Sequence, residues 1–231
     1  MLSNLLLFPL NTVLVPGLVM PLHIFEERYR NLVELLLAEP DEESREFGII
    51  AIRDGMSVEA DGITALYEVG TATLLRQVER FEDGRFDIVT TGSRRFRLHE
   101  VDSSQPLARG IVEFLDEPTD MDDPIVAQQV AQLFTVYRNL LGGRLDTQSD
   151  ADSALEIEAG DDLPDDPTVL SYLVTAAMVL PTPDRQQLLA TPDTLGRLTL
   201  ARSILSHENA LIAGLGAVPA IDLLSAPTCP N

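Results

Sequence analysis

The chain has 231 residues, 45% of them hydrophobic, which is enough to bury a core as one large domain or two smaller ones. Acidic residues outnumber basic ones by 37 to 16, so the formal net charge is −21. Binding to nucleic acid or to an anionic membrane depends on neutralising cations, so this charge predicts neither as a partner.

Several residue types needed for catalysis are missing. All basic residues are arginines, and a chain without lysine cannot form a G-x-x-x-x-G-K-[ST] phosphate loop or a serine–lysine dyad. The single cysteine, Cys229, supports neither an internal disulfide nor a zinc site. His23, His99 and His207 lie in separate segments without metal-ligand spacing. We therefore predict no cofactor, no metal and no catalytic residue.

The first 25 residues are apolar and carry no charged side chain before Glu26. Pro9, Pro16 and Pro21 interrupt this run, and no basic segment precedes it, so it fits neither a membrane span nor a secretory signal. We expect buried strands in a soluble cytoplasmic protein. An amphipathic helix should follow, because apolar residues recur at helical spacing at Phe25, Tyr29, Leu32, Val33, Leu36 and Leu37.

Short strand-like segments separated by turns continue to about residue 117. Asp83-Gly84 predicts the turn of a hairpin, and Gly70 suggests a bulge or a close approach of two backbones. Together these segments predict a compact, partly closed barrel. The expected strands are Phe47–Ile52, Leu66–Leu75, Gln77–Phe81, Arg85–Thr91, Arg94–Val101 and Ala108–Phe114.

Beyond residue 117 the pattern becomes helical. The expected helices run from Pro124 to a stop at Gly142-Gly143, from Pro167 to Leu180, from Asp184 to Ala190, and onward from Pro192. Residues 146–166 hold nine carboxylates and no basic residue. A calcium loop would need a glycine and a terminal glutamate that are not at loop spacing, so we interpret this stretch as a solvated acidic linker.

Several stretches resemble the amino-terminal, substrate-binding domain of Lon proteases, in the form that occurs as a free-standing bacterial protein. They are "FPL…PG…PLHIFEERYRNLV", "FGIIAI", "VGTATLLRQVERFEDGRFDIVTTGSRRFRL", "PLARGIVEFLDE" and "DDPTVLSYLVTAAMVLPTPDRQQLLATPDTLGRLTLARSIL". The resemblance implies an α+β fold, a PUA-like six-stranded pseudobarrel followed by a helical bundle. We expect the barrel in residues 1–117, the bundle with its acidic linker 146–166 in residues 118–212, and a tail in residues 213–231.

The same resemblance implies recognition of protein or peptide segments by a non-catalytic, adaptor- or chaperone-like module. The expected partners are unfolded or partly unfolded polypeptides, with a protease as a second candidate. The apolar, proline-broken segment 16–22 suits a groove for such segments, and core packing is the alternative. We predict Phe8, Leu18, Met20 and Phe25 as contacts and Arg95 as a charge at the rim of the groove.

Two other functions remain open at this point. A hydrolase or peptidase-associated protein of unknown activity would need an acid–base pair, and no G-x-S-x-G motif is present. A PUA-like RNA-binding module would use Arg94, Arg95 and Arg97. Side chains on a strand alternate between its faces, and three arginines stand against a net charge of −21, so the RNA signal is weak.

Overall fold

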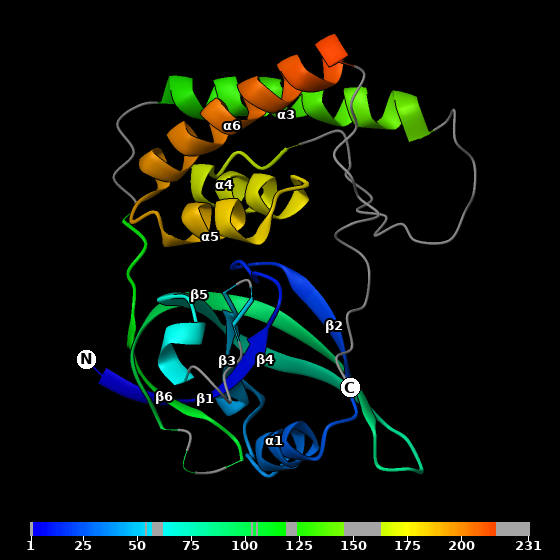
Figure 1. The fold of residues 1–231 in the computed structure, drawn as a ribbon, viewed down its shortest axis with the longest axis vertical. Coiled ribbons are helices and arrows are strands. Elements are labelled where there is room, and N and C mark those ends of the chain that lie inside the picture. The colour runs from blue at the N-terminus through cyan, green and yellow to red at the C-terminus, as the bar shows by residue number, and fades with distance from the viewer. Residues whose placement is uncertain are drawn as a thin grey trace. The chain divides into compact units, whose positions relative to one another are not determined.

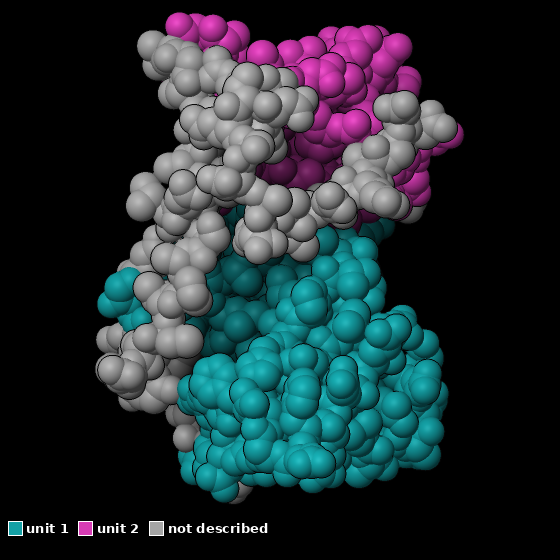
Figure 2. Space-filling model, turned by 90° about the vertical axis from the view of Figure 1, so that its right-hand side faces the viewer, with its two compact units in different colours: residues 1–117, 182–190 teal, residues 118–181, 191–231 magenta. Residues whose placement is uncertain are grey.

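The computed structural model describes the chain in two compact units, drawn as a ribbon in Figure 1 and coloured teal and magenta in Figure 2. The first unit comprises residues 1–117 and 182–190, and the second comprises residues 118–181 and 191–231. The residues described are 2–53, 55–56, 62–102, 104, 106–118, 124–145 and 163–215. None of the helices in these ranges combines the length and the hydropathy that a membrane crossing needs.

A six-stranded mixed sheet forms the first unit, which confirms the predicted α+β fold class. The strands are β1 (Leu2–Leu10), β2 (Val19–Ile24), β3 (Glu46–Ala51), β4 (Val69–Arg80), β5 (Phe86–Asp102) and β6 (Arg109–Phe114). β1 pairs in parallel with β3 and antiparallel with β6, and β6 also pairs with β5. The ring β1–β3–β4–β5–β6 therefore closes on itself, and β2 extends the sheet beyond β5.

Two strands are longer than the sequence predicts. β4 joins the expected segments 66–75 and 77–81, and β5 joins 85–91 and 94–101. Register shifts between β4 and β5 fall at Ala72/Thr73 and Leu75/Gln77, so bulges absorb the irregularities and the strands continue through them. Gly84, with φ +83°, turns the hairpin between the two strands as predicted.

The predicted amphipathic helix is α1 (Glu27–Leu37), which packs against the strands. Its buried side chains are Tyr29, Leu32, Val33 and Leu36. Phe8 of β1 stacks on Tyr29 with ring centroids 4.0 Å apart. Phe25 lies before the first turn of the helix and is exposed, so it belongs to the surface although its spacing places it on the apolar face.

One helix belongs to a different unit than the sequence suggests. α5 (Thr182–Ala190) is predicted as part of the helical bundle, but it groups with the barrel unit. The side-chain amide of Gln186 donates to the Val69 carbonyl of β4 at 2.7 Å. The Leu189 carbonyl accepts a hydrogen bond from Arg95 of β5 at 3.0 Å. These bonds fix α5 on the outside of the sheet.

The second unit contains α3 (Pro124–Leu145), α4 (Pro167–Ala177) and α6 (Thr194–Leu215). The predicted stop at Gly142-Gly143 is wrong, because α3 continues to Leu145. Among the described residues positive φ is confined to Gly17, Gly55 and Gly84, so Gly142 keeps a right-handed helical conformation. Residues 146–162 lie outside the described residues, and with them most of the acidic stretch that was considered as a calcium loop or a linker. Residues 216–231, with Cys229, also lie outside.

Asp166 caps the amino terminus of α4. Its carboxylate accepts hydrogen bonds from the backbone N–H groups of Thr168 at 2.8 Å and Val169 at 3.0 Å. We expect Asp166→Ala to lower the free energy of unfolding of this helix by about 1 kcal/mol, because it leaves both donors without this acceptor. Hydrogen exchange of the α4 amides measures this loss. Asp166→Asn should restore most of it, and equal protection in Asp166→Ala would contradict the capping role.

Candidate functional site

The second half of the proline-broken segment 16–22 belongs to an edge strand, β2. β2 pairs antiparallel with β5, from Val19 opposite Thr91 to Ile24 opposite Phe86. Pro21 sits opposite Val89 within this pairing. Proline lacks a backbone N–H and is tolerated at a sheet edge when that position faces away from the neighbouring strand.

The outer edge of β2 leaves backbone groups available. The Leu18 carbonyl accepts from the Gly92 N–H at 3.0 Å, and the Met20 carbonyl accepts from the Thr90 hydroxyl at 3.2 Å, so these carbonyls face β5. Alternation along a strand turns the backbone of Val19, Pro21 and His23 the other way. No strand in the described part of the chain pairs with that side. An extended segment could therefore be added there, with Pro21 limiting the number of donors.

Four of the predicted contact residues lie near α1 and β2, at different depths. Phe25 is 55% exposed. Leu18 and Met20 are half-buried, with their side chains packed against the core. Phe8 is buried beneath them and stacks on Tyr29, so the prediction that it is available as a contact is wrong. Alternation accounts for Met20, because the even positions of β2 face the core and the odd ones face solvent.

Arg95 does not place a charge at a rim. It is 0% exposed, its Nε lies 2.5 Å from a carboxylate oxygen of Glu117, and it donates to the Leu189 carbonyl at 3.0 Å. The prediction fails because α5, which is about ninety residues away in sequence, covers this face of β5. Arg95 therefore holds the first unit together.

A polar and aromatic cluster surrounds His23 on β2. Its Nδ1 lies 2.5 Å from Oδ1 of Asp87, and its Nε2 lies 3.4 Å from the Arg85 guanidinium. A neutral ring with its proton on Nδ1 satisfies both contacts. The ring centroids of Phe25 and Phe81 lie 6.2 Å and 6.3 Å from that of His23. The cluster thus combines a His–Asp pair, a guanidinium and two aromatic rings.

Arg85 also organises the carboxylate at the tip of the hairpin. The Arg85 backbone N–H donates to Asp83 at 3.1 Å, and its guanidinium donates at 2.6 Å. The backbone hydrogen bond, supported by the guanidinium, holds the pKa of the Asp83 carboxyl below its ordinary value. The carboxylate thus stays charged at neutral pH and keeps Arg85 oriented.

A shallow depression of about 470 Å³ runs across β2, β5 and β4 beside this cluster. The register aligns Pro21, Val89 and Gln77 in one row, and His23, Asp87 and Glu79 in the row two residues further along. The lining residues are Pro21, Leu22, His23, Gln77, Val78, Glu79, Asp87, Ile88 and Val89. We call the outer edge of β2, this depression and the exposed side chains of Val19 and Phe25 together the β2 face. It combines apolar contact area with hydrogen-bonding groups.

The arginine triplet does not form a patch for nucleic acid. Arg94 is ion-paired with Glu46 at 3.0 Å, and its guanidinium lies 3.5 Å from the centre of the Phe114 ring. Arg95 is buried against Glu117, and Arg97 is exposed. Within the described ranges, no group of three or more histidine, cysteine, aspartate or glutamate side chains is arranged to hold a metal ion.

Solved structures with the same fold include two Lon amino-terminal domains. The Lon N-terminal domain protein from Xanthomonas campestris superposes with a TM-score of 0.62 at 23% identity, covering 88% of this chain and 98% of that chain. The N-terminal domain of the Mycobacterium avium complex Lon protease gives 0.61 at 19% identity, with the same coverage of each chain. These likenesses confirm the Lon-type fold.

Sequence comparison agrees with the fold. Lon protease 2 of Syntrophobacter fumaroxidans is 29% identical over 201 residues, which is 85% of this chain and 23% of that protein. Lon protease of Desulfovibrio desulfuricans is 27% identical over 198 residues, which is 86% of this chain and 21% of that protein. The chain thus spans less than a quarter of the length of these relatives. The family model of the ATP-dependent protease La (LON) substrate-binding domain matches residues 4–207, so the chain belongs to that non-catalytic, substrate-recognising family.

Proposed function

We propose that this chain binds extended or partly unfolded polypeptide segments at the β2 face, as an adaptor or holdase in the cytoplasm. The matching family is described as a substrate-binding domain, and the relatives are named as Lon proteases, whose substrates are polypeptides. The bound segments would accordingly be candidates for proteolysis, and a protease is the proposed recipient.

The open edge of β2 supports this proposal most directly. A polypeptide that adds a strand to a sheet edge gains main-chain hydrogen bonds whatever its sequence, which suits a binder of many different segments. The carbonyls of Val19, Pro21 and His23 and the N–H groups of Val19 and His23 face that side. Because Pro21 removes a donor from the middle of the edge, pairing is limited, and stable edge-to-edge aggregation is disfavoured.

Side chains on either side of the edge supply apolar contact. Val19 and Phe25 are 56% and 55% exposed, at the two ends of β2. Half-buried Met20 and Leu18 lie beneath and could adapt to different side chains. Exposed aromatic residues are frequent anchors in binding sites. Contacts of this kind are weakly screened by salt, so the affinity should change little between low and moderate ionic strength.

Phe25→Asp tests the role of the aromatic anchor. We expect a roughly tenfold weaker Kd for a fluorescently labelled, reduced and carboxymethylated unfolded protein, which corresponds to about 1.4 kcal/mol. The substitution removes apolar contact area and adds a charge where a peptide would lie. Fluorescence anisotropy measures the affinity, and Phe25→Leu should retain most of it.

Val169→Asp is the matched control. Val169 is similarly exposed but lies in the first turn of α4, where an added carboxylate is compatible with the helix dipole. We expect this variant to bind the labelled polypeptide like the unmodified chain. Equal affinity in Phe25→Asp and Val169→Asp would exclude the β2 face as the binding surface.

A further inference from the structure

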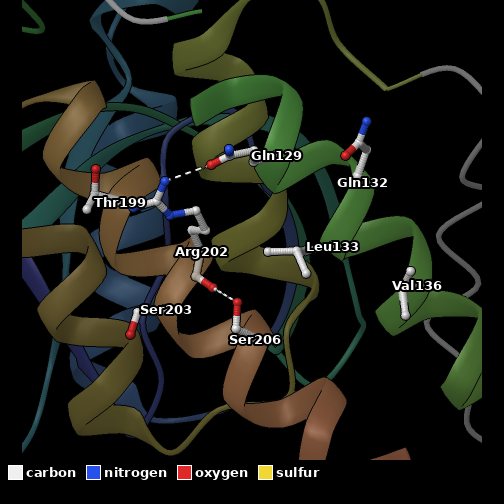
Figure 3. Close-up of a pocket in the computed structure, with 8 residues that line it drawn as sticks. All are labelled: Gln129, Gln132, Leu133, Val136, Thr199, Arg202, Ser203 and Ser206. Atoms are coloured by element: carbon white, nitrogen blue, oxygen red, sulfur yellow. Dashed lines mark hydrogen bonds between the residues drawn. The ribbon is translucent and has the colours of Figure 1, made fainter. Parts of the chain in front are cut away.

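A second hollow lies in the helical unit, between α3 and α6. It has a volume of about 960 Å³, and Figure 3 shows the side chains that line it. Gln129, Gln132, Leu133 and Val136 line it from α3, and Thr199, Arg202, Ser203 and Ser206 line it from α6. We call this hollow the α3–α6 groove. Sequence reasoning did not identify it, although its lining follows a regular pattern.

The pattern is the same on both helices. The lining positions on α3 are spaced i, i+3, i+4 and i+7, and those on α6 repeat this spacing. Such positions form one stripe along a helix, extending over two turns. Two stripes that face a common groove provide the ridges between which a third helix can pack. The groove therefore has the form of a helix-binding site.

The lining of the groove carries one charged side chain, the cation Arg202, in a chain whose formal net charge is −21. The sequence of α3 contains no aspartate or glutamate, and α6 contains only Glu208. Arg202 lines the groove and donates to the Gln129 side-chain carbonyl across it at 2.7 Å. A carboxylate could replace that neutral acceptor with a stronger, charge-assisted bond.

The apolar lining lies on α3. Val136 is 47% exposed and Leu133 is half-buried. Ile125, one turn before Gln129 on the same stripe, is also exposed. These side chains offer contact to an apolar stripe of a partner helix, while the serines, threonine and glutamines around them supply hydrogen-bonding groups.

We propose that the α3–α6 groove binds an acidic amphipathic helix of another polypeptide. Its apolar stripe would pack on Leu133 and Val136, and its carboxylates would meet Arg202. A second copy of this chain is a poor occupant, because two bodies of charge −21 repel each other. The inference is independent of the proposed function, since it concerns the other unit and a helical rather than an extended ligand.

The test uses the full chain and labelled synthetic helices of about 18 residues, or about five turns. The first peptide has leucines at i, i+3, i+4 and i+7 positions and glutamates on either side of this stripe. The second has lysine at every glutamate position, and the third is the acidic peptide with two central prolines. We expect the acidic peptide to bind at least about tenfold tighter than either of the others by fluorescence anisotropy.

Variants of the chain locate the binding. Arg202→Glu and Val136→Asp should each weaken the acidic peptide by roughly tenfold, with unchanged circular dichroism. Val169→Asp on α4 and Arg80→Glu on β4 are controls that should bind it normally, as should Phe25→Asp. Preference for the lysine peptide, equal binding of the proline peptide, or normal binding by Arg202→Glu and Val136→Asp would overturn the proposal. Self-association of the chain that Val136→Asp abolishes would also overturn it, by assigning the groove to a second copy.

Discussion

Replacing Arg95 with methionine is expected to lower the stability of the first unit by about 3 kcal/mol, because it removes one partner of a buried ion pair. Arg95 is fully buried and bridges Glu117 at the end of the barrel segment to Leu189 of α5. Loss of the guanidinium leaves the Leu189 carbonyl without this donor and releases α5 from β5. Urea unfolding combined with hydrogen exchange of the α5 amides should show both effects.

The neighbouring arginine provides the control. Arg94 pairs with Glu46 at the surface, and its side chain is about half exposed. Arg94→Met should therefore cost about 1 kcal/mol or less, as is usual for exposed ion pairs. If Arg94→Met and Arg95→Met lose the same small amount, the assignment of Arg95 as the residue that attaches α5 is wrong.

Gly92→Ala is the second substitution with a large expected effect. A Cβ at this position would lie 2.4 Å from the Val15 carbonyl oxygen, which accepts a hydrogen bond from the Leu18 N–H at 3.2 Å. Gly92 exchanges hydrogen bonds with Gly17 and Leu18, at 2.9 Å and 3.0 Å. We expect a loss of stability of about 2–3 kcal/mol from the forced backbone shift. The shift moves the start of β2, so binding of unfolded polypeptide should weaken as well.

Gly142→Ala separates this steric effect from a general effect of replacing glycine. Gly142 lies within α3, and a Cβ there would meet no atom within 4 Å. Alanine in a helix interior is favoured over glycine by about 0.5–1 kcal/mol, so this variant should be slightly more stable. A Gly92→Ala variant as stable as Gly142→Ala would contradict the close packing at Gly92.

Local signals were sufficient to predict much of the fold. The periodicity of α1 identified its buried side chains, and the Asp83-Gly84 turn located the β4–β5 hairpin. The prediction of a close approach at Gly70 is confirmed, since a Cβ there would lie 2.4 Å from Cζ of Phe96 and 2.7 Å from the Ile49 carbonyl. The extent of α3 could not be predicted in this way, because Gly142 is both a common helix terminator and a tolerated interior residue.

The candidate site was harder to predict, because exposure depends on partners that are distant in sequence. The alternation of Arg95 and Phe96 along β5 indicates that their side chains leave the strand on opposite sides. The sequence around Arg95 does not show that its side is buried, because the covering helix is α5. Phe8 and Phe25 are both aromatic residues of the apolar amino-terminal segment, and nothing local in the sequence tells them apart. Phe8 is buried because it stacks on Tyr29, whereas Phe25 is exposed. Pro21 is the proline of segment 16–22 that lies within a strand. It does not interrupt the strand, because its position on the outer edge requires no backbone N–H donor.

Hydrogen exchange of the full chain, with and without the carboxymethylated unfolded protein, tests whether the β2 face binds polypeptide. If it does, the amides at Val19 and His23 on the outer edge of β2, together with those flanking Phe25, exchange more slowly when the polypeptide is bound. This protection should disappear in Phe25→Asp and persist in Val169→Asp. Binding without any protection of β2, or protection confined to the helical unit, would contradict the assignment of the β2 face as the polypeptide-binding surface.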